Sequence, residues 1–409
     1  MAAGRREHSE SELAGRGRSA VRGMAWDHPR ARGPLEAISG EWSRESGVSV
    51  AWDARPLKAF EDQPLEELAT AYDLVLIDHP FVGFAATSEL IAPVNDWVDA
   101  PYLADQATHS VGPSYPSYTW QGKQWALAID AACQVSAVRD DLWSDANLES
   151  LPDTWADVID LAERSRAAAC KVAIPLNPNH AYCAFLSIGV SVAGDMFWPA
   201  ETQVDRAAGR ESLEFLRQLA TRVHPASCSG DPIAISDRMT RSDEILFVPL
   251  MFGYSSYARR GFRPRTLRFG NAPQGGAGIL GSVLGGVGLA LSARSTRRAE
   301  AADLARRIAA PQTQSGIYVS AGGQPGHATA WDSPSVNAQV GGFFGATRYT
   351  IERAFMRPRV SGHRRFQQLA GELIHRFVWL GDTSAELCLS AFERLVDSLL
   401  WDTGRRAVV

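Results

Sequence analysis

The sequence predicts an α/β protein whose N-terminal part forms an open, mainly parallel β-sheet. Three short apolar runs, at 24–26, 48–52 and 72–77, are each expected to form a strand, and helical patterns separate them. The run at 72–77 is almost continuously apolar, which is typical of a strand buried on both faces. A strand-helix-strand-helix-strand order indicates a parallel sheet covered by helices.

Two helices are expected between these strands. Leu35, Ile38 and Trp42 are spaced to lie on one helix face, and Gly47 is suited to end that helix. The second helix is predicted at about 64–69, where Pro64 suits the first helical turn.

A second α/β unit is expected downstream. Residues 126–138 are predicted to form a strand, and helices are predicted at 155–167 and 210–223. The segment 174–180 is rich in turn formers and is predicted to be a loop. Residues 244–250 are predicted to form a strand that returns to the first unit.

The segment 275–288 is dense in glycine but matches neither the GxxxxGK[ST] nor the GxGxxG pattern, so no phosphate-binding loop is predicted. Tight turns beside a strand at 287–291 are expected, with backbone close to a ligand as a further interpretation. A helix is predicted at 299–309, and two or three amphipathic helices are predicted within 349–399.

Charge and length exclude several classes of protein. With 41 Lys and Arg against 46 Asp and Glu, the net charge is −5, which argues against a nucleic-acid partner. The longest apolar stretch, at 279–291, is interrupted by glycines, so no membrane span is predicted. A chain of 409 residues is long enough for two or three domains.

Five scattered cysteines predict reduced thiols or at most one disulfide, and no clustered metal ligands occur. No GxSxG, HExxH, Walker or SxxK motif is present, so no metal, no cofactor and no catalytic set is predicted. Residues 1–22 are polar and arginine-rich, and we expect them to be a disordered extension rather than a secretory signal. The expected location is cytoplasmic as the sequence stands, or extracytoplasmic if an export signal was missed or removed.

A short Asp-His-Pro sequence occurs twice, at 27–29 and 78–80, each time directly after a predicted strand. In open α/β sheets, ligands bind beyond the carboxyl ends of the strands. If the two strands are neighbours, both Asp-His pairs face one crevice. Three interpretations remain open: turn and helix-cap chemistry, contact with a ligand, and catalysis or metal binding. The candidate residues are Asp27, His28, Asp78 and His79.

An aromatic segment at 115–125 is interpreted as exposed. Its side chains would serve either as packing at the edge of the fold or as a stacking platform for a flat ligand such as a sugar.

Six segments in order resemble the extracellular solute-binding proteins of bacterial ABC importers, in particular the group that binds sugars. Residues 122–130 (GKQWALAID) look like "GKxYGLPxD" of that family, and 151–157 (LPDTWAD) resemble "PxTWdE". Residues 284–293 (LGGVGLALSA) are similar to "GGxGlaIsa". The remaining similar segments are 135–142, 299–312 and 357–359. The resemblance extends over nearly all of 23–400.

The resemblance implies an α/β, two-lobe, periplasmic-binding-protein-like fold with a hinge and a ligand cleft between the lobes. It adds Asp130, Tyr254, Gly285 and Gly286 to the expected ligand-binding residues. The implied division of the chain is a first lobe of 23–128 plus about 245–300 and a second lobe of 129–244 plus about 301–409.

The function implied is capture of a small polar, sugar-like ligand as the substrate-binding component of an ABC-type system, with ABC permease subunits as possible partners. The alternative is a cytoplasmic enzyme of lyase, cyclase or hydrolase type on the same scaffold. In that enzyme His28 or His79 would act as general base and Asp27 or Asp78 would orient it. An intracellular sensor that reports the ligand to a partner protein is a third possibility.

Overall fold

The computed structural model describes residues 20–56, 64–148, 150–199, 202–276 and 281–401, so most of the predicted N-terminal extension lies outside the described residues. One ten-stranded sheet runs through these residues in the order β2-β1-β3-β11-β7-β9-β8, with three short strands at its sides. The main strands are β1 (Ala20–Trp26), β2 (Ser49–Arg55), β3 (Leu74–Ile77), β7 (Leu127–Val138), β8 (Lys171–Val172), β9 (Ile245–Phe252) and β11 (Ser282–Ser292). The short strands are β4 (Ile91–Ala92), β10 (Arg268–Gly270) and β12 (Ala354–Phe355), and β5 (Thr119–Trp120) pairs separately with β6 (Lys123–Gln124).

The first lobe is built on β1, β2 and β3, which are parallel as predicted, and on the end of β11, which is antiparallel to β3. Its core is one apolar cluster that includes the buried strand β3 and the predicted helix face of Leu35, Ile38 and Trp42. The covering helices are α2 (Pro29–Ser46), α4 (Leu65–Ala71), α5 (Val82–Thr87), α6 (Ala100–Thr108), α7 (Ser114–Ser117), α13 (Arg298–Ala309) and α14 (Pro311–Thr313).

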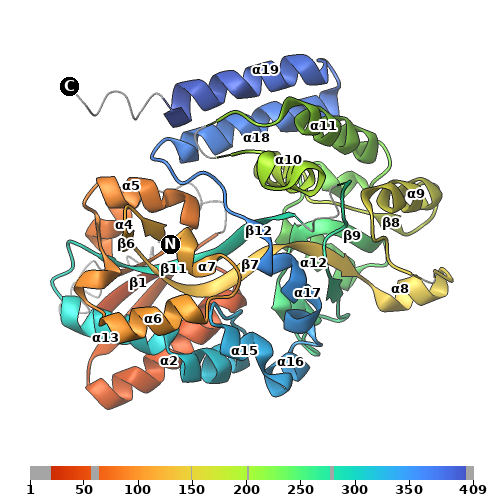
Figure 1. The fold of residues 1–409 in the computed structure, drawn as a ribbon. Helices are drawn as coiled ribbons and strands as arrows, with labels where there is room; N and C mark the ends of the chain where they lie inside the picture. The colour runs from red at the N-terminus through yellow and green to blue at the C-terminus, as the bar shows by residue number, and fades with distance from the viewer. Residues whose placement is uncertain (1–19, 57–63, 149, 200–201, 277–280, 402–409) are drawn as a thin grey trace, which may run out of the picture.

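The second lobe places β7, β9 and β8 between two helical layers (Figure 1). The layers are formed on one side by α9 (Trp155–Ser165), α10 (Pro178–Ala193), α11 (Arg206–Ala220), α18 (His363–Leu380) and α19 (Ala385–Val396), and on the other by α12 (Pro232–Arg241), α15 (Ala328–Asp332), α16 (Pro334–Gln339) and α17 (Phe343–Glu352). The short helix α8 (Asp140–Asp145) follows β7.

Two long strands join the lobes. The first residues of β7, Leu127–Ile129, belong to the core of the first lobe, whereas Val138 at its other end belongs to that of the second. The strand β11 crosses in the opposite direction and pairs with β7 from Leu284 to Leu289. The middles of these two strands therefore form the floor between the lobes.

The structure differs from the sequence predictions at several boundaries. β1 begins at Ala20, so residues 20–22 are part of a strand and not of a disordered extension. β9 pairs with β7 and β8 in the second lobe, whereas α13 packs into the core of the first, so both segments lie in the opposite lobe from the one predicted. Sequence patterns locate strands and helices, but lobe membership depends on pairing between distant segments.

The predicted loop at 174–180 contains the start of α10. Asn177 caps this helix through its side chain, which accepts a hydrogen bond from the backbone N–H of His180, and Pro178 begins it. The helix is buried from His180 to Ser191. Because α10 is apolar on all sides, its sequence shows no amphipathic periodicity that would predict a helix. The only recognisable local signal was the group of turn residues at 174–180.

The aromatic segment at 115–125 is not an exposed platform. Tyr118 and Trp125 are buried in the core of the first lobe. The hydroxyl of Tyr118 donates to the backbone oxygen of Ile77 at 3.1 Å. Tyr118 therefore supports the end of β3 from inside the lobe.

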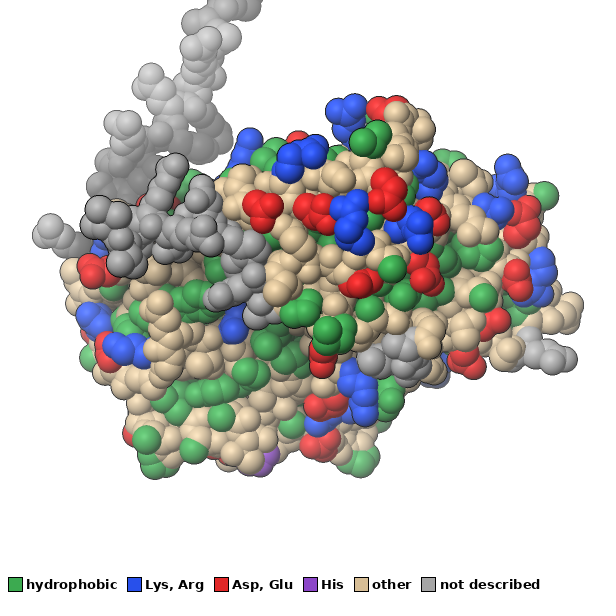
Figure 2. All heavy atoms as spheres, turned by 45° about the horizontal axis from the view of Figure 1, so that its top comes forward, with side chains coloured by type: hydrophobic (Ala, Val, Ile, Leu, Met, Phe, Trp, Pro, Cys, Tyr) green, Lys and Arg blue, Asp and Glu red, His purple; other side chains and the backbone are tan. Residues whose placement is uncertain are grey.

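The five cysteines all lie among the described residues, and no disulfide joins any two of them. Among the described residues, no helix combines the length and the apolarity that crossing a membrane would require. The face that includes α11, α18 and α19 carries interspersed basic and acidic side chains (Figure 2). There Arg206 forms ion pairs with Glu386 and Glu393, which joins α11 to α19.

Candidate functional site

A cavity of about 70 Å³ lies between the lobes, above the middles of β7 and β11. Five of the predicted site residues line it: Asp78, Asp130, Tyr254, Gly285 and Gly286. The other lining residues were not predicted from the sequence: Trp26, Arg30, Ala132, Asn179, His180, Pro232, Phe252, Val287 and Arg357. We call this cavity the cleft.

The first Asp-His-Pro sequence serves the turn and cap role. Asp27 is exposed and forms an ion pair with Arg32 at 3.2 Å. His28 caps α2, because its Nδ1 accepts a hydrogen bond from the backbone N–H of Arg30 at 3.0 Å. Burial lowers the pKa of His28 to about 4, so the imidazole is neutral near pH 7. Neither side chain lines the cleft, but together they fix the start of α2.

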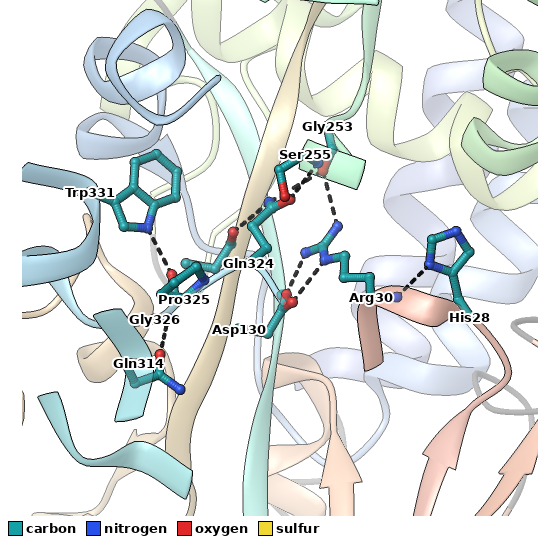
Figure 3. A network of polar contacts seen from close by, with 12 residues as sticks. His28, Arg30, Asp130, Gly253, Ser255, Gln314, Gln324, Pro325, Gly326 and Trp331 are labelled. Atoms are coloured by element: carbon teal, nitrogen blue, oxygen red, sulfur yellow. Dashed lines mark hydrogen bonds and ion pairs between the residues drawn. The ribbon is translucent and has the colours of Figure 1, made fainter. Parts of the chain in front are cut away.

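The residue that reaches the cleft from this turn is Arg30. Its guanidinium forms two hydrogen bonds with the Asp130 carboxylate and donates from Nη1 to the backbone oxygen of Gly253 at 3.0 Å (Figure 3). It also lies over the Tyr254 ring, 4.5 Å from the ring centre. Both members of the ion pair are almost completely buried. A bidentate pair of this kind joins the first lobe to the crossing strand.

The second Asp-His-Pro sequence follows β3. Asp78 lines the cleft, and burial raises the pKa of its carboxyl group. His79 begins a short 3-10 helix, His79–Phe81, is fully buried, and is not among the residues that line the cleft. Burial, with the nearby Arg357 as a second cause, lowers its pKa well below 6.5.

Neither Asp-His pair forms the dyad that acid/base catalysis would need. Among the described residues, no hydrogen bond or ion pair joins Asp27 to His28 or Asp78 to His79. Neither Asp27 nor His28 lines the cleft, and in the second pair only Asp78 does. The geometry therefore gives the enzyme interpretation no support.

The two predicted glycines allow close approach at the floor of the cleft. Gly286 has φ +95°, and a Cβ there would collide with the backbone oxygen of Asp130. A Cβ at Gly285 would press on the ring of Phe252. The β7–β11 register shifts between Val287 and Gly288, which bends the strands at this point.

A hydrogen-bond network holds the floor from behind (Figure 3). The Gln324 side chain donates from Nε2 to the backbone oxygen of Ala131 at 2.7 Å and accepts at Oε1 from the Ser255 N–H at 2.9 Å. Trp331 donates from its indole N–H to the backbone oxygen of Pro325 at 2.8 Å. The Gln324 bonds connect the 324–326 loop to β7 and to Ser255, which follows β9, and the Trp331 bond connects the loop to α15.

The second lobe contributes a polar wall. Arg357 donates from Nη1 to Oε1 of Gln367 at 2.8 Å, and Gln367 donates from Nε2 to Oδ1 of Asn179 at 2.8 Å. His180, on the first turn of α10, completes the wall, and burial lowers its pKa to about 3. Sequence signals for this wall were the turn-rich segment at 174–180 and the Arg-Pro pair at 357–358, but neither was assigned to the site.

A larger cavity of about 530 Å³ lies beside the cleft, between α4, α5 and the start of α18. Asp78 borders both cavities. The larger cavity is also lined by the apolar side chains of Leu65, Phe81 and Phe84 and by the basic side chains of Arg364 and Arg365.

One group of potential metal ligands lies outside the cleft. Asp105 on α6 and His109, the C-cap of α6, lie beside His327, and one ligand atom from each falls within 4.8 Å of the others. Oδ1 of Asp105 lies 2.9 Å from Nδ1 of His109, and Oδ2 of Asp105 lies 3.3 Å from Nε2 of His327. Burial lowers the pKa of His327 below 6.5, which favours the neutral imidazole. The sequence had indicated no such cluster.

The fold is found in solved structures of ABC-transporter solute-binding proteins. Maltose-bound MalE3 of T. maritima has a TM-score of 0.80 at 16% identity over 93% of this chain and 100% of its own. The solute-binding protein of Thermotoga lettingae bound to α-D-tagatose gives 0.80 at 15%, over 93% and 100% of the two chains. That of Agrobacterium radiobacter in complex with ribitol gives 0.77 at 17%, over 93% and 98%.

No protein-family model and no curated protein matches the sequence. The structural likeness nevertheless covers both lobes, so the chain has the two-lobe solute-binding-protein fold that its sequence motifs indicated.

Proposed function

We propose that the protein captures a small polar, sugar-like ligand in the cleft, as the substrate-binding component of an ABC-type system. The observation that supports this most strongly is the composition of the cleft. Trp26, Phe252 and Tyr254 supply aromatic surfaces, and Asp78, Asn179 and His180 supply hydrogen-bonding groups from both lobes. Aromatic faces with a few convergent polar groups are the chemistry that binds a hydroxylated ring or chain.

The cleft is smaller than the roughly 300–1,000 Å³ of ordinary ligand pockets. The cleft must therefore widen for a sugar-sized ligand to enter, and separation of the lobes would supply that space. Rotation about the middles of β7 and β11 would open the cleft without breaking either core, because each strand end stays in its own lobe. Permease subunits that respond to such closure are the partners that this function implies.

A thermal-shift screen against sugars, polyols and sugar acids tests the proposal. A ligand at 100 times its dissociation constant stabilises the folded protein by about 2.7 kcal/mol, which gives a measurable shift. Trp26→Leu should abolish the shift, because the indole lines the cleft. The matched control is Trp52→Leu, which removes a half-buried indole on β2 outside the cleft and should keep the shift.

Mass spectrometry of the recovered ligand distinguishes binding from catalysis. An unchanged ligand supports the proposal. A chemically altered ligand would contradict it, and a shift that survives Trp26→Leu would move binding away from the cleft.

A further inference from the structure

Three arginines are buried among the described residues: Arg30, Arg139 and Arg357. Arg30 forms its ion pair with Asp130, and Arg139 is paired with Asp141 at 2.8 Å and Asp243 at 2.7 Å. Arg357 differs from both, because no carboxylate oxygen of the described residues lies within ion-pair distance of it. A buried cation without a counter-ion is costly, so this position is suited to an anion that comes from outside the chain.

The hydrogen-bonding capacity of Arg357 is also incompletely used. The guanidinium makes one hydrogen bond, to the neutral amide of Gln367, and its buried Nε has no partner among the described residues. His180 lines the same cavity and is 3% exposed, yet its Nδ1 has no hydrogen-bond partner in the described part of the chain. Buried polar atoms are nearly always hydrogen-bonded, so these two nitrogens, Nε of Arg357 and Nδ1 of His180, are available to a polar group of a ligand in the cleft.

The wall stands at the N-terminal end of α10, a helix of 16 residues that begins at Pro178. The positive end of the helix dipole and the charge of Arg357 both favour an anion at this place. Asp78 lines the cleft from the first lobe, and among the described residues it forms no ion pair with Arg357. Burial raises the pKa of its carboxyl group, with the charge of Arg357 as an opposing second cause, so this carboxyl group is a weaker counter-ion for Arg357 than an exposed one would be.

We propose that the ligand of the cleft is a small hydroxylated carboxylate, such as a sugar acid, whose carboxylate binds Arg357 and His180. This inference rests on the proposed function, which it narrows from sugar-like ligands in general to acidic ones. The hydroxyl groups of the ligand face Asp78 and the aromatic rings of the first lobe. Asp130 is not part of the anion site, since both of its carboxylate oxygens accept hydrogen bonds from Arg30.

Matched ligand pairs test the proposal by titration calorimetry. Gluconate and sorbitol share one carbon skeleton and differ by the carboxylate, as do galactonate and galactitol or ribonate and ribitol. Glucose 6-phosphate is a separate arm that distinguishes phosphate from carboxylate. A hydrogen-bonded charge pair is worth about 1.5–3 kcal/mol, so an acid should bind about 10- to 150-fold more tightly than its polyol.

The variant Arg357→Gln should reduce the affinity for the acid to that for the polyol. The control is Arg353→Gln, which removes an exposed arginine four residues earlier and should leave the affinity unchanged. If polyols bind as tightly as acids, the inference is overturned while the proposed function stands. If only the phosphate arm binds, the carboxylate assignment is wrong. If no member of the panel binds, the proposed function fails with it.

A measurement without ligand tests the premise separately. Arg357→Met removes a buried, uncompensated charge, so its melting temperature should equal or exceed that of the unsubstituted protein. Arg30→Met leaves Asp130 buried without its partner and should lower the melting temperature. Equal lowering by both substitutions would show that Arg357 is already satisfied within the chain and would overturn the inference.

Discussion

Arg30 and Asp130 form a bidentate ion pair across 100 positions of sequence, and the pair lies in the cleft between the lobes. It ties the first turn of α2 to the crossing strand β7. Because both side chains are buried, neither can exchange its partner for water. The stability of the interlobe region therefore depends on both members of the pair.

Asp130→Asn should lower the free energy of unfolding by about 3–5 kcal/mol, because it leaves the Arg30 charge buried without a counter-ion. The control is Asp27→Asn, which breaks the exposed ion pair with Arg32 and should cost less than about 1 kcal/mol. Urea denaturation measures both values. Similar losses in the two variants would show that burial of the Arg30–Asp130 pair does not matter for stability.

Gly286→Ala should destabilise the protein much more than Gly122→Ala. Both glycines have positive φ, so each substitution introduces the same kind of backbone strain, of order 1 kcal/mol. Only at Gly286 would the added Cβ also collide with the Asp130 backbone, whereas Gly122 has open space. Melting temperatures by circular dichroism should therefore fall further for Gly286→Ala. Equal decreases would refute the close approach of β11 to β7 at this point.

Acid should destabilise the protein from about pH 6.5 downward. The pKa of His28 falls from 6.5 in the unfolded chain to about 4 in the folded protein, so the unfolded chain binds more protons in this range. Each such histidine removes about 1.4 kcal/mol of stability per pH unit as the pH decreases toward 4. Burial of His180 and His363, whose pKa values are about 3, extends the loss to lower pH.

His28→Asn isolates one of these contributions, because asparagine also caps helices and can accept the hydrogen bond from the Arg30 N–H. Between pH 6 and 4.5 the variant should lose stability less steeply, by about one proton in the slope of unfolding free energy against pH. Urea denaturation at several pH values measures this slope. An unchanged slope would mean that His28 does not titrate on unfolding as its burial implies.

Local sequence pattern was sufficient for the strands and amphipathic helices, because these depend on periodicity within one segment. The helix face of Leu35, Ile38 and Trp42 packs in the first core as predicted. The pattern was insufficient for α10, whose apolar residues surround the whole helix. It also could not assign β9 to a lobe, because strand order depends on long-range pairing.

For the site, sequence located the two turns beyond β1 and β3, but only one of their four candidate side chains lines the cleft. Asp78 does reach it, whereas His28 caps a helix and His79 is fully buried outside the lining of the cleft. Arg30 follows the first turn directly, but its role depends on Asp130, which is distant in sequence. Arg357 can be recognised only in three dimensions, because what sets it apart is that the described residues place no carboxylate within ion-pair distance of it.

Hydrogen–deuterium exchange, with and without the ligand that gives the largest thermal shift, tests the central claim of an interlobe binding site most directly. The account predicts slower exchange in segments of both lobes that line the cleft, 26–30 in the first and 178–180 and 252–254 in the second. Protection confined to a single lobe, or located away from these segments, would contradict it.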